Sequence, residues 1–207
     1  MFNVARGETK PTERSKMDKE NRTSAKAANK LKEIRARKWE AVSKDLSDWG
    51  VPVKNCQRYI SDYGKDKMIE MCECFKIFDH TETGYISRPE MALVSNCLGK
   101  AWSRNFIQRM LQNCDKNGDA VLDFMEFVEL YINHESEFQS LLNDLKVAFE
   151  VMDTDQSGYL SPEELRIVMD KIGRPMSDEE TAHFLLIADK NGDGEIDFVE
   201  FAKLIIK

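Results

Sequence analysis

The sequence predicts an all-α protein of four helix-loop-helix units, arranged as two pairs and preceded by a basic helical extension. Two observations lead to this fold class. Segments that begin with Asp and end with Glu recur at Asp79, Asp115, Asp153 and Asp189, at spacings of 36, 38 and 36 residues. Apolar residues recur at helical spacing on both sides of each segment. Because a longer interval separates two equal ones, the units are expected to form two pairs.

The charges divide the chain in the same way. Its 207 residues carry a net charge of −7, but residues 1–66 carry +6 and residues 67–207 carry −13. We therefore expect a basic extension at 1–66, a first pair at 67–134 and a second pair at 135–207. No apolar run is long enough to span a membrane. The five cysteines form no CxxC pair, which argues against zinc and disulfides and favours a reducing, cytoplasmic setting.

The basic extension is expected to contain one amphipathic helix, at about residues 24–49. Residues 1–23 are polar and predicted to be disordered. Gly50 and Pro52 end the helix before a linker to Lys67, in which at most one turn, around Tyr59, is expected. A basic helix of this kind has three possible states: docked on one of the pairs of the same chain, docked on an external partner, or solvated and unattached. The apolar face consists of Leu31, Ile34, Val42, Leu46 and Trp49.

The boundaries of the later helices carry ordinary stop and start signals. Gly99 and Gly173 follow apolar helical runs, and Ser177 with Glu180 forms a capping box that starts a helix. No Gly or Pro interrupts residues 124–152. The connector between the two pairs is therefore either a continuous helix or one that breaks near residues 133–136.

The Asp-led segments have the oxygen-rich pattern of calcium-binding loops. Calcium takes about six to eight oxygen ligands, which a loop supplies from positions 1, 3, 5, 7, 9 and 12, with a bend at position 6 that favours Gly. Two segments meet every requirement, with Gly158 and Gly194 at the bend. The third loop offers Asp153, Asp155, Ser157, the Tyr159 carbonyl, Ser161 and Glu164. The fourth offers Asp189, Asn191, Asp193, the Glu195 carbonyl, Asp197 and Glu200.

The second loop departs from the pattern at its bend. Ala120 stands where Gly is favoured, and a Cβ costs about 1–2 kcal/mol in left-handed backbone geometry. Four carboxylates can offset this cost, so we expect calcium binding that is weaker than in an equivalent glycine loop. The predicted ligands are Asp115, Asn117, Asp119, the Val121 carbonyl, Asp123 and Glu126.

The first loop has few charged ligands, because only Asp79 and Glu90 carry a charge. Ligand charge tunes affinity, so we expect this loop to be weak or unoccupied and to serve as the structural partner of the second loop. The prediction is three calcium sites, or four if the first loop binds, with Mg²⁺ as a competitor. The candidate ligands are Asp79, Thr81, Thr83, the Tyr85 carbonyl, Ser87 and Glu90. Short β-bridges are expected to join Ile86 with Leu122 and Leu160 with Ile196, the residues at position 8.

From residue 67 to about residue 207 the chain resembles the calmodulin and troponin C superfamily of EF-hand proteins. The stretch SPEELRIVMDKIGRPMSDEETAHFLLIADKNGDGEIDFVEFAKLI, from Ser161 to Ile205, is similar to the second half of calmodulin almost position for position. FKIFD and EMALVSNCLG, around the first loop, are also similar. The Thr-rich first loop, Ala120, three tryptophans and the first 66 residues depart from calmodulin.

The resemblance implies two lobes whose helix pairs open on calcium binding and expose an apolar groove for a target helix. Such grooves are often rich in Met. The methionines of this chain either line such a groove or belong to its core. Those considered are Met71, Met91, Met110, Met125, Met152, Met169 and Met176.

We expect a cytoplasmic calcium sensor that regulates a protein partner. The alternative is a calcium-binding structural subunit of a cytoskeletal, contractile or axonemal assembly, anchored by its basic extension. An enzyme is not expected, because the three His residues are scattered and no nucleophile elbow or phosphate loop occurs. A nucleic-acid partner is not expected either, since no recognised reading motif appears.

Overall fold

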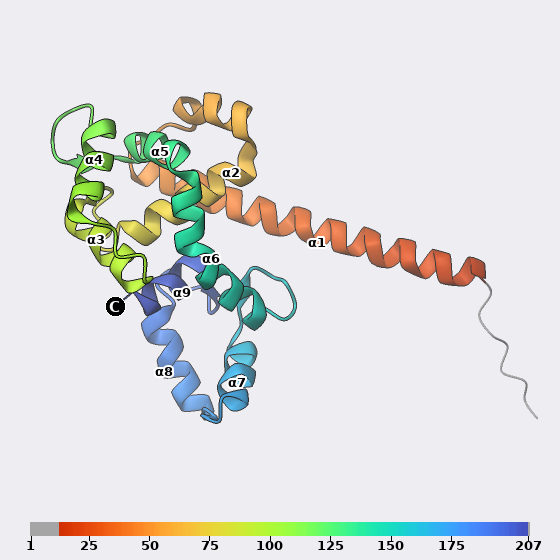
Figure 1. Cartoon of the computed structure of the whole chain (residues 1–207). Helices are drawn as coiled ribbons and strands as arrows, with labels where there is room; N and C mark the ends of the chain where they lie inside the picture. The colour runs from red at the N-terminus through yellow and green to blue at the C-terminus, as the bar shows by residue number, and fades with distance from the viewer. Residues whose placement is uncertain (1–12, 207) are drawn as a thin grey trace, which may run out of the picture. The chain divides into compact units, whose positions relative to one another are not determined.

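A computed structural model describes residues 13–206, with side chains from residue 25 onward (Figure 1). The residues group into two compact units, with the boundary between Lys38 and Trp39. Helix α1, Glu13–Asp48, begins in the first unit and ends in the second. The second unit contains both helix-loop-helix pairs. Within residues 13–206, no helix combines the length and apolar character that a membrane crossing requires.

Helix α1 starts earlier than the apolar pattern predicts. The pattern indicates a start near residue 24, whereas the helix begins at Glu13, because residues 13–30 contain neither Gly nor Pro and are rich in helix formers. The prediction of disorder is therefore wrong for residues 13–23, and residues 1–12 lie outside the described part. Leu31 is exposed, whereas Val42 and Leu46 are buried.

The predicted linker at residues 50–67 is wrong, because most of this stretch is helical. A 3₁₀ turn, η1 (Val53–Cys56), leads directly into α2 (Gln57–Phe78). The helix is interrupted at Gly64, whose φ of 85° and ψ of 166° are accessible only to Gly. Cys56 is fully buried, and Tyr59 and Ile60 pack against the core, so tertiary burial stabilises a segment whose local signals are weak.

The first pair has the predicted helix-loop-helix arrangement. Helix α2 leads into the first loop, and α3 (Arg88–Cys97) follows it; α4 (Arg104–Cys114) and α5 (Phe124–Asn133) enclose the second loop. The strands β1 (Ile86–Ser87) and β2 (Val121–Leu122) join the loops in antiparallel register. Ile86 pairs with Leu122, as predicted.

The second pair repeats this arrangement. Helices α6 (Glu135–Met152) and α7 (Pro162–Lys171) flank the third loop, and α8 (Asp178–Ala188) and α9 (Phe198–Ile205) flank the fourth. The strands β3 (Tyr159–Leu160) and β4 (Ile196–Asp197) pair Leu160 with Ile196. The predicted capping box of Ser177 and Glu180 starts α8. The all-α fold of two EF-hand pairs is confirmed.

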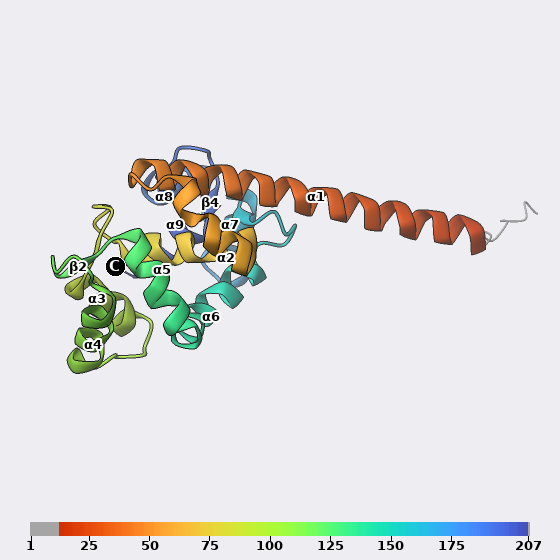
Figure 2. The same ribbon diagram turned by 90° about the horizontal axis from the view of Figure 1, so that it is seen from above.

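The connector between the pairs is broken. His134, with φ −131° and ψ 33°, ends α5 and precedes α6, so the two helices meet at an angle (Figure 2). The break falls inside the range 133–136. Both helices can then bury apolar faces, because Phe127 and Tyr131 of α5 and Phe138 of α6 pack ring against ring.

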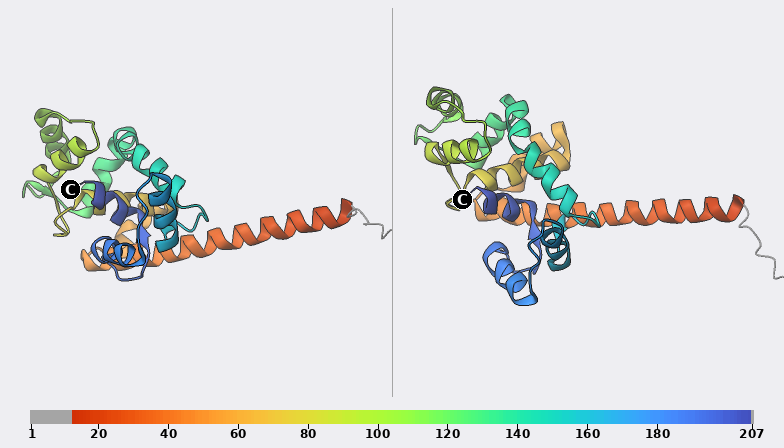
Figure 3. Two further views of the ribbon diagram at one scale, coloured as in Figure 1. Left: turned by 90° about the horizontal axis from the view of Figure 1, so that it is seen from below. Right: turned by 60° about the horizontal axis from the view of Figure 1, so that its bottom comes forward.

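The two pairs share contacts rather than lying apart. Helix α9, at the end of the chain, lies beside α2 of the first pair (Figure 3). The Lys203 ammonium of α9 donates to Glu82 in the first loop at 2.9 Å. Phe138 of α6 is fully buried among aromatic rings of the first pair. These rings belong to Phe78, Trp102, Phe127 and Tyr131.

The methionines differ in burial. Met71, Met91 and Met110 are fully buried in the core of the first pair. Met125 of the first pair is half-buried, as are Met152, Met169 and Met176 of the second. The core interpretation therefore holds for the first three, whereas the other four keep part of their surface open.

Candidate metal centre

Each loop is held between a helix end and a capping box. The Asp at position 1 closes the preceding helix, as when the backbone N–H of Asp153 donates to the carbonyl of Phe149 at 2.9 Å. The residue at position 9 caps the following helix, and the Glu at position 12 completes the capping box in all four loops. The predicted ligands at positions 1, 9 and 12 are thus helix-end residues, so the helices position these three before any metal arrives. The four glutamates, Glu90, Glu126, Glu164 and Glu200, are only 6–7% exposed.

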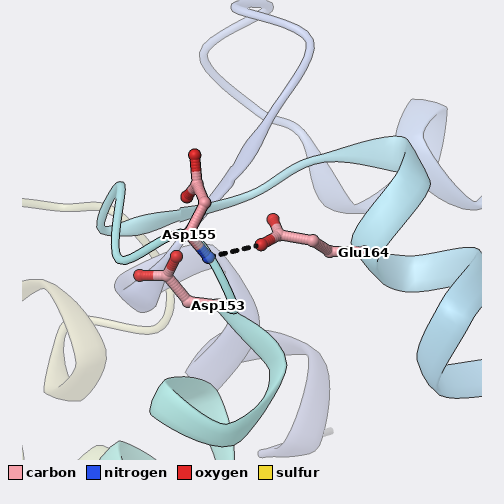
Figure 4. Close-up of side chains that lie close together, drawn as sticks. All are labelled: Asp153, Asp155 and Glu164. Carbon is pink, nitrogen blue, oxygen red and sulfur yellow. Dashed lines mark hydrogen bonds between the residues drawn. The ribbon is translucent and has the colours of Figure 1, made fainter. Parts of the chain in front are cut away.

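The third loop brings its carboxylates together (Figure 4). Oxygen atoms of Asp153, Asp155 and Glu164 lie within 4.8 Å of one another. Among the side chains that the structure describes, no other three His, Cys, Asp or Glu residues converge in this way. The Ser157 hydroxyl donates to the Tyr159 carbonyl at 2.9 Å, which places the donors of positions 5 and 7 side by side.

The Glu164 side chain reaches back to the start of the third loop. Its carboxylate accepts from the backbone N–H of Thr154 at 2.8 Å and of Asp155 at 3.3 Å, and from the Ser161 hydroxyl at 2.9 Å. Burial alone would raise the pKa of Glu164, but these hydrogen bonds outweigh it and hold the pKa below its ordinary value. Three predicted ligands of this loop, Asp153, Asp155 and Glu164, therefore converge on one volume, and Ser161 is hydrogen-bonded to Glu164.

In the fourth loop, side-chain oxygens of the predicted ligands accept hydrogen bonds from backbone N–H groups of the same loop. Asp189 accepts from the N–H groups of Gly192 at 2.6 Å and Gly194 at 2.9 Å. Asn191 accepts from Asp193, and Asp193 from Glu195, so the predicted ligands form one hydrogen-bonded turn. Burial, and then the negative charge of Asp197, raise the pKa of Glu200. A divalent cation would offset this crowding of negative charge.

The second loop has the same hydrogen-bonded turn despite its Ala. Asp115 accepts from Gly118 at 2.7 Å and from Ala120 at 3.0 Å, which matches the bonds of Asp189 in the fourth loop. Ala120 has φ of 66°, in the left-handed region. The left-handed bend that the sequence predicted at position 6 is therefore present, although Ala120 carries a Cβ where Gly is favoured. Asn117, Asp119, Asp123 and Glu126 take the same places as their counterparts in the fourth loop.

In the first loop, the glutamate at position 12, Glu90, is hydrogen-bonded by residues of the same loop. Glu90 accepts from the N–H and hydroxyl groups of Thr81, at 3.1 and 2.6 Å, and from those of Ser87, at 2.8 and 2.7 Å. Burial alone would raise the pKa of Glu90, but these four bonds outweigh it and lower the pKa. Asp79 is held by Thr83 and Gly84, and the Thr83 hydroxyl reaches the Tyr85 carbonyl. The carboxylates of Asp79 and Glu90 thus find their hydrogen-bond donors within the loop.

A second left-handed position was missed by the sequence analysis. Position 4 has a positive φ in all four loops. Gly118 and Gly192 occupy it in the second and fourth loops, whereas Glu82 and Gln156, both at 57°, occupy it in the first and third. The segment DKNGD, which the second and fourth loops share, has its Gly at position 4 and could have indicated the left-handed conformation there.

The donor sets fit a hard cation. Loops two to four present carboxylate, amide, hydroxyl and carbonyl oxygens, with no Cys or His at a ligand position, and calcium prefers oxygen ligands. In the third loop the carboxylates already converge on one volume. In all three loops the carboxylates also accept from backbone N–H groups, so binding would exchange some of these bonds for metal contacts.

A tryptophan outside the loops also contacts the site. The ring centroids of Trp49, which directly follows α1, and of Phe124, at position 10 of the second loop, lie 5.1 Å apart. The sequence placed Trp49 on the apolar face of a helix but did not relate it to the loops. Contact with a loop depends on tertiary packing and leaves no local signal.

Comparison with known proteins agrees with this geometry. The family model for an EF-hand domain pair matches residues 68–132 and again residues 142–206. The chain belongs to the EF-hand family, and it carries two such pairs.

Its curated relatives place it in the calmodulin-like branch of this family. A putative calmodulin-like protein 6 from Oryza sativa subsp. japonica is 31% identical over 151 residues, covering 70% of this chain and 87% of that protein. The probable calcium-binding protein CML25 from Arabidopsis thaliana is 36% identical over 138 residues, covering 67% and 74%. Polcalcin Cup a 4 from Hesperocyparis arizonica is 35% identical over 136 residues, covering 66% and 79%. The resemblance to the calmodulin and troponin C superfamily is confirmed.

Proposed function

We propose that this protein is a cytoplasmic calcium sensor that binds calcium in its second, third and fourth loops and acts on a protein partner. The convergence of Asp153, Asp155 and Glu164 on one volume carries the proposal, because such crowded carboxylates favour a cation between them. The names of the relatives, calmodulin-like and calcium-binding, support it. Magnesium is expected to compete for the same oxygens.

The second pair is the expected contact for a partner. Val151, Ile172 and Leu186 are 73%, 63% and 77% exposed. The first pair, by contrast, has its apolar interior filled by Phe138 of the same chain. Residues 135–206 carry seventeen acidic and six basic residues. Exposed apolar side chains on a pair rich in acidic residues suit a basic amphipathic helix, the kind of ligand that EF-hand grooves accept.

Calorimetric titration with calcium tests the binding step. The unchanged chain is compared with the double variant Glu164→Gln, Glu200→Gln, which removes the closing carboxylate of the third and fourth loops. We expect the variant to lose two binding events and to keep that of the second loop. If the unchanged chain takes up no calcium at millimolar concentration, the proposal is wrong.

A second experiment tests the sensor role. A sensor must change its surface with calcium, so binding of an apolar fluorescent dye should rise when calcium is added and fall with a chelator. The Glu164→Gln, Glu200→Gln double variant is the matched control and should show a much smaller rise. An equal rise in both proteins, or none in the unchanged chain, would contradict a sensor that works through the second pair.

The structural-subunit function remains the second candidate, because basic residues of α1 such as Lys26 and Lys32 are exposed. A basic exposed helix can attach a protein to an acidic assembly. Extraction of cells separates the two functions: a fixed subunit stays with the insoluble cytoskeleton with or without chelator, whereas a sensor changes fraction with calcium.

A further inference from the structure

The end of α1 is packed into the first EF-hand pair. Within the second unit, Leu46 is completely buried, Val42 is almost so, and Trp49 is half-buried against the core. The Lys76 ammonium of α2 donates to the Asp45 carboxylate at 3.2 Å. Residues 39–49 therefore contribute both apolar and charged contacts to the first pair. The EF-hand sequence pattern of that pair does not include them.

Trp49 contacts both loops of that pair. Its ring lies 4.7 Å from Phe75, at the end of the helix that enters the first loop, and 5.1 Å from Phe124, in the second loop. A Cβ added to Gly84, the bend of the first loop, would lie 3.4 Å from the indole Cδ1. The indole thus fills the space beside the bend and connects it with the second loop.

A tight turn fixes the indole in this place. Gly50 has φ of 70°, its N–H donates to the Ser47 carbonyl at 3.0 Å, and the Val51 N–H donates to the Leu46 carbonyl at 2.7 Å. These two bonds form a helix-ending motif that reverses the chain directly after Trp49. The tryptophan is held by the backbone on one side and by two aromatic rings on the other.

The same tryptophan lines the cavity that the predicted ligands face. A cavity of about 750 Å³ lies between the end of α1 and the first two loops. Trp49 and Asp45 line it together with Asp79, Asp119 and Asp123, which are predicted ligands. A change at Trp49 would therefore act directly on the surroundings of these carboxylates.

We propose that Trp49 is a positioning residue for the first EF-hand pair and raises the calcium affinity of the second loop. The indole offers no oxygen ligand, so it acts by holding the two loops in their paired geometry before calcium binds. Pre-organisation of this kind lowers the ordering cost of binding. The inference rests on the proposed function and adds a residue outside the twelve-residue loops.

The test uses the full chain in the Glu164→Gln, Glu200→Gln background, so that calorimetry reports the first pair alone. Trp49→Ala is expected to weaken calcium binding about tenfold, since it removes two aromatic contacts. Trp39→Ala is the matched control: Trp39 lies in α1, in the same segment 39–49, and its ring faces the Lys65 ammonium at 4.7 Å rather than a loop. Thermal unfolding in chelator verifies that each variant is folded.

Trp49→Leu, which keeps an apolar side chain but removes the ring, is measured alongside. The comparison with Trp39→Ala is then possible even if Trp49→Ala does not fold. A loss of affinity in the Trp49 variants but not in Trp39→Ala supports the inference. Unchanged affinity in the Trp49 variants, or an equal loss in Trp39→Ala, overturns it and leaves the proposed function standing. No calcium uptake by the unchanged chain overturns both.

Discussion

Ala120 carries a side chain in a backbone conformation that favours Gly. Its φ of 66° is close to that of Gly194 at the same position of the fourth loop, 83°. A Cβ in this region costs about 1–2 kcal/mol. The second loop therefore combines a strong donor set with a strained bend.

Replacing Ala120 with Gly should strengthen calcium binding by the second loop about tenfold, if the strain falls mainly on the bound state. Calorimetry in the Glu164→Gln, Glu200→Gln background measures this affinity. Ala101→Gly is the matched control, because Ala101 also has a positive φ, 44°, but lies outside the loops. Equal affinities before and after the Ala120 change would show that the bend does not limit binding.

Glu90 stands at position 12, where the other loops have a proposed metal ligand, and both its carboxylate oxygens accept hydrogen bonds from its own loop. Glu90→Gln should lower the free energy of unfolding by about 1–3 kcal/mol, because an amide group cannot accept all four hydrogen bonds from Thr81 and Ser87. Urea denaturation in chelator measures the loss.

Calcium stoichiometry separates this role from metal binding. We expect Glu90→Gln to bind as many calcium ions as the unchanged chain, whereas the control Glu126→Gln should lose the site of the second loop. Loss of a calcium ion from Glu90→Gln would show that the first loop is a metal site after all.

At the scale of elements, the bend inside α2 depends on one glycine. An added Cβ at Gly64 would meet no atom within 4 Å, so the cost of a side chain is purely conformational. Gly64→Ala should lower the free energy of unfolding by about 1–3 kcal/mol. Urea denaturation measures it, with Ser61→Ala, an exposed site in the same helix, as the control. Equal stability of both variants would mean that the helix straightens without penalty.

The same element shows where local signals are insufficient. Gly50 and Pro52 predict the end of a helix and a linker to Lys67, yet η1 and α2 fill most of this range. The helical turns form because Cys56, Tyr59 and Ile60 pack against the core. The spacing of Gly and Pro does not show that side chains of this segment are buried against residues distant in the sequence.

For the whole molecule, a charge cluster joins the two pairs. Glu70 of α2 accepts from Lys67 at 2.7 Å and from Lys146 of α6 at 3.0 Å, and Lys67 also contacts Glu135. Burial alone would raise the pKa of Glu70, but the two ammonium groups outweigh it and lower the pKa. The ionised carboxylate therefore stabilises the fold above the ordinary pKa of Glu, and this stabilisation is lost as the pH falls through the lowered value.

Glu70→Gln should accordingly destabilise the protein by about 1–3 kcal/mol at neutral pH, and the difference from the unchanged chain should shrink in acid. Urea denaturation at several pH values measures both effects. Asp62→Asn is the control, because Asp62 and Arg58 form an exposed pair at 3.8 Å, worth at most about 1 kcal/mol. A difference that persists unchanged in acid would exclude the ionised carboxylate as its source.

The local parts of the candidate site were predictable. Loop ligands lie within twelve residues of one another, so spacing alone identifies Asp153 and Glu164, and the bridge between Leu160 and Ile196 follows from the pairing of loops. The place of Trp49 beside Gly84 and Phe124 could not be predicted, because residues 35 and 75 positions apart in sequence are brought together only by packing.

By itself, the sequence determined four helix-loop-helix units, their pairing, the donor oxygens of each loop and the left-handed bend at Ala120, because each depends on residue type and short-range spacing. Only the tertiary structure decided that the connector breaks at His134, that Phe138 fills the first pair and that residues 39–49 pack against its loops. These features arise from burial of apolar surface, which is non-directional and does not specify its partner in advance.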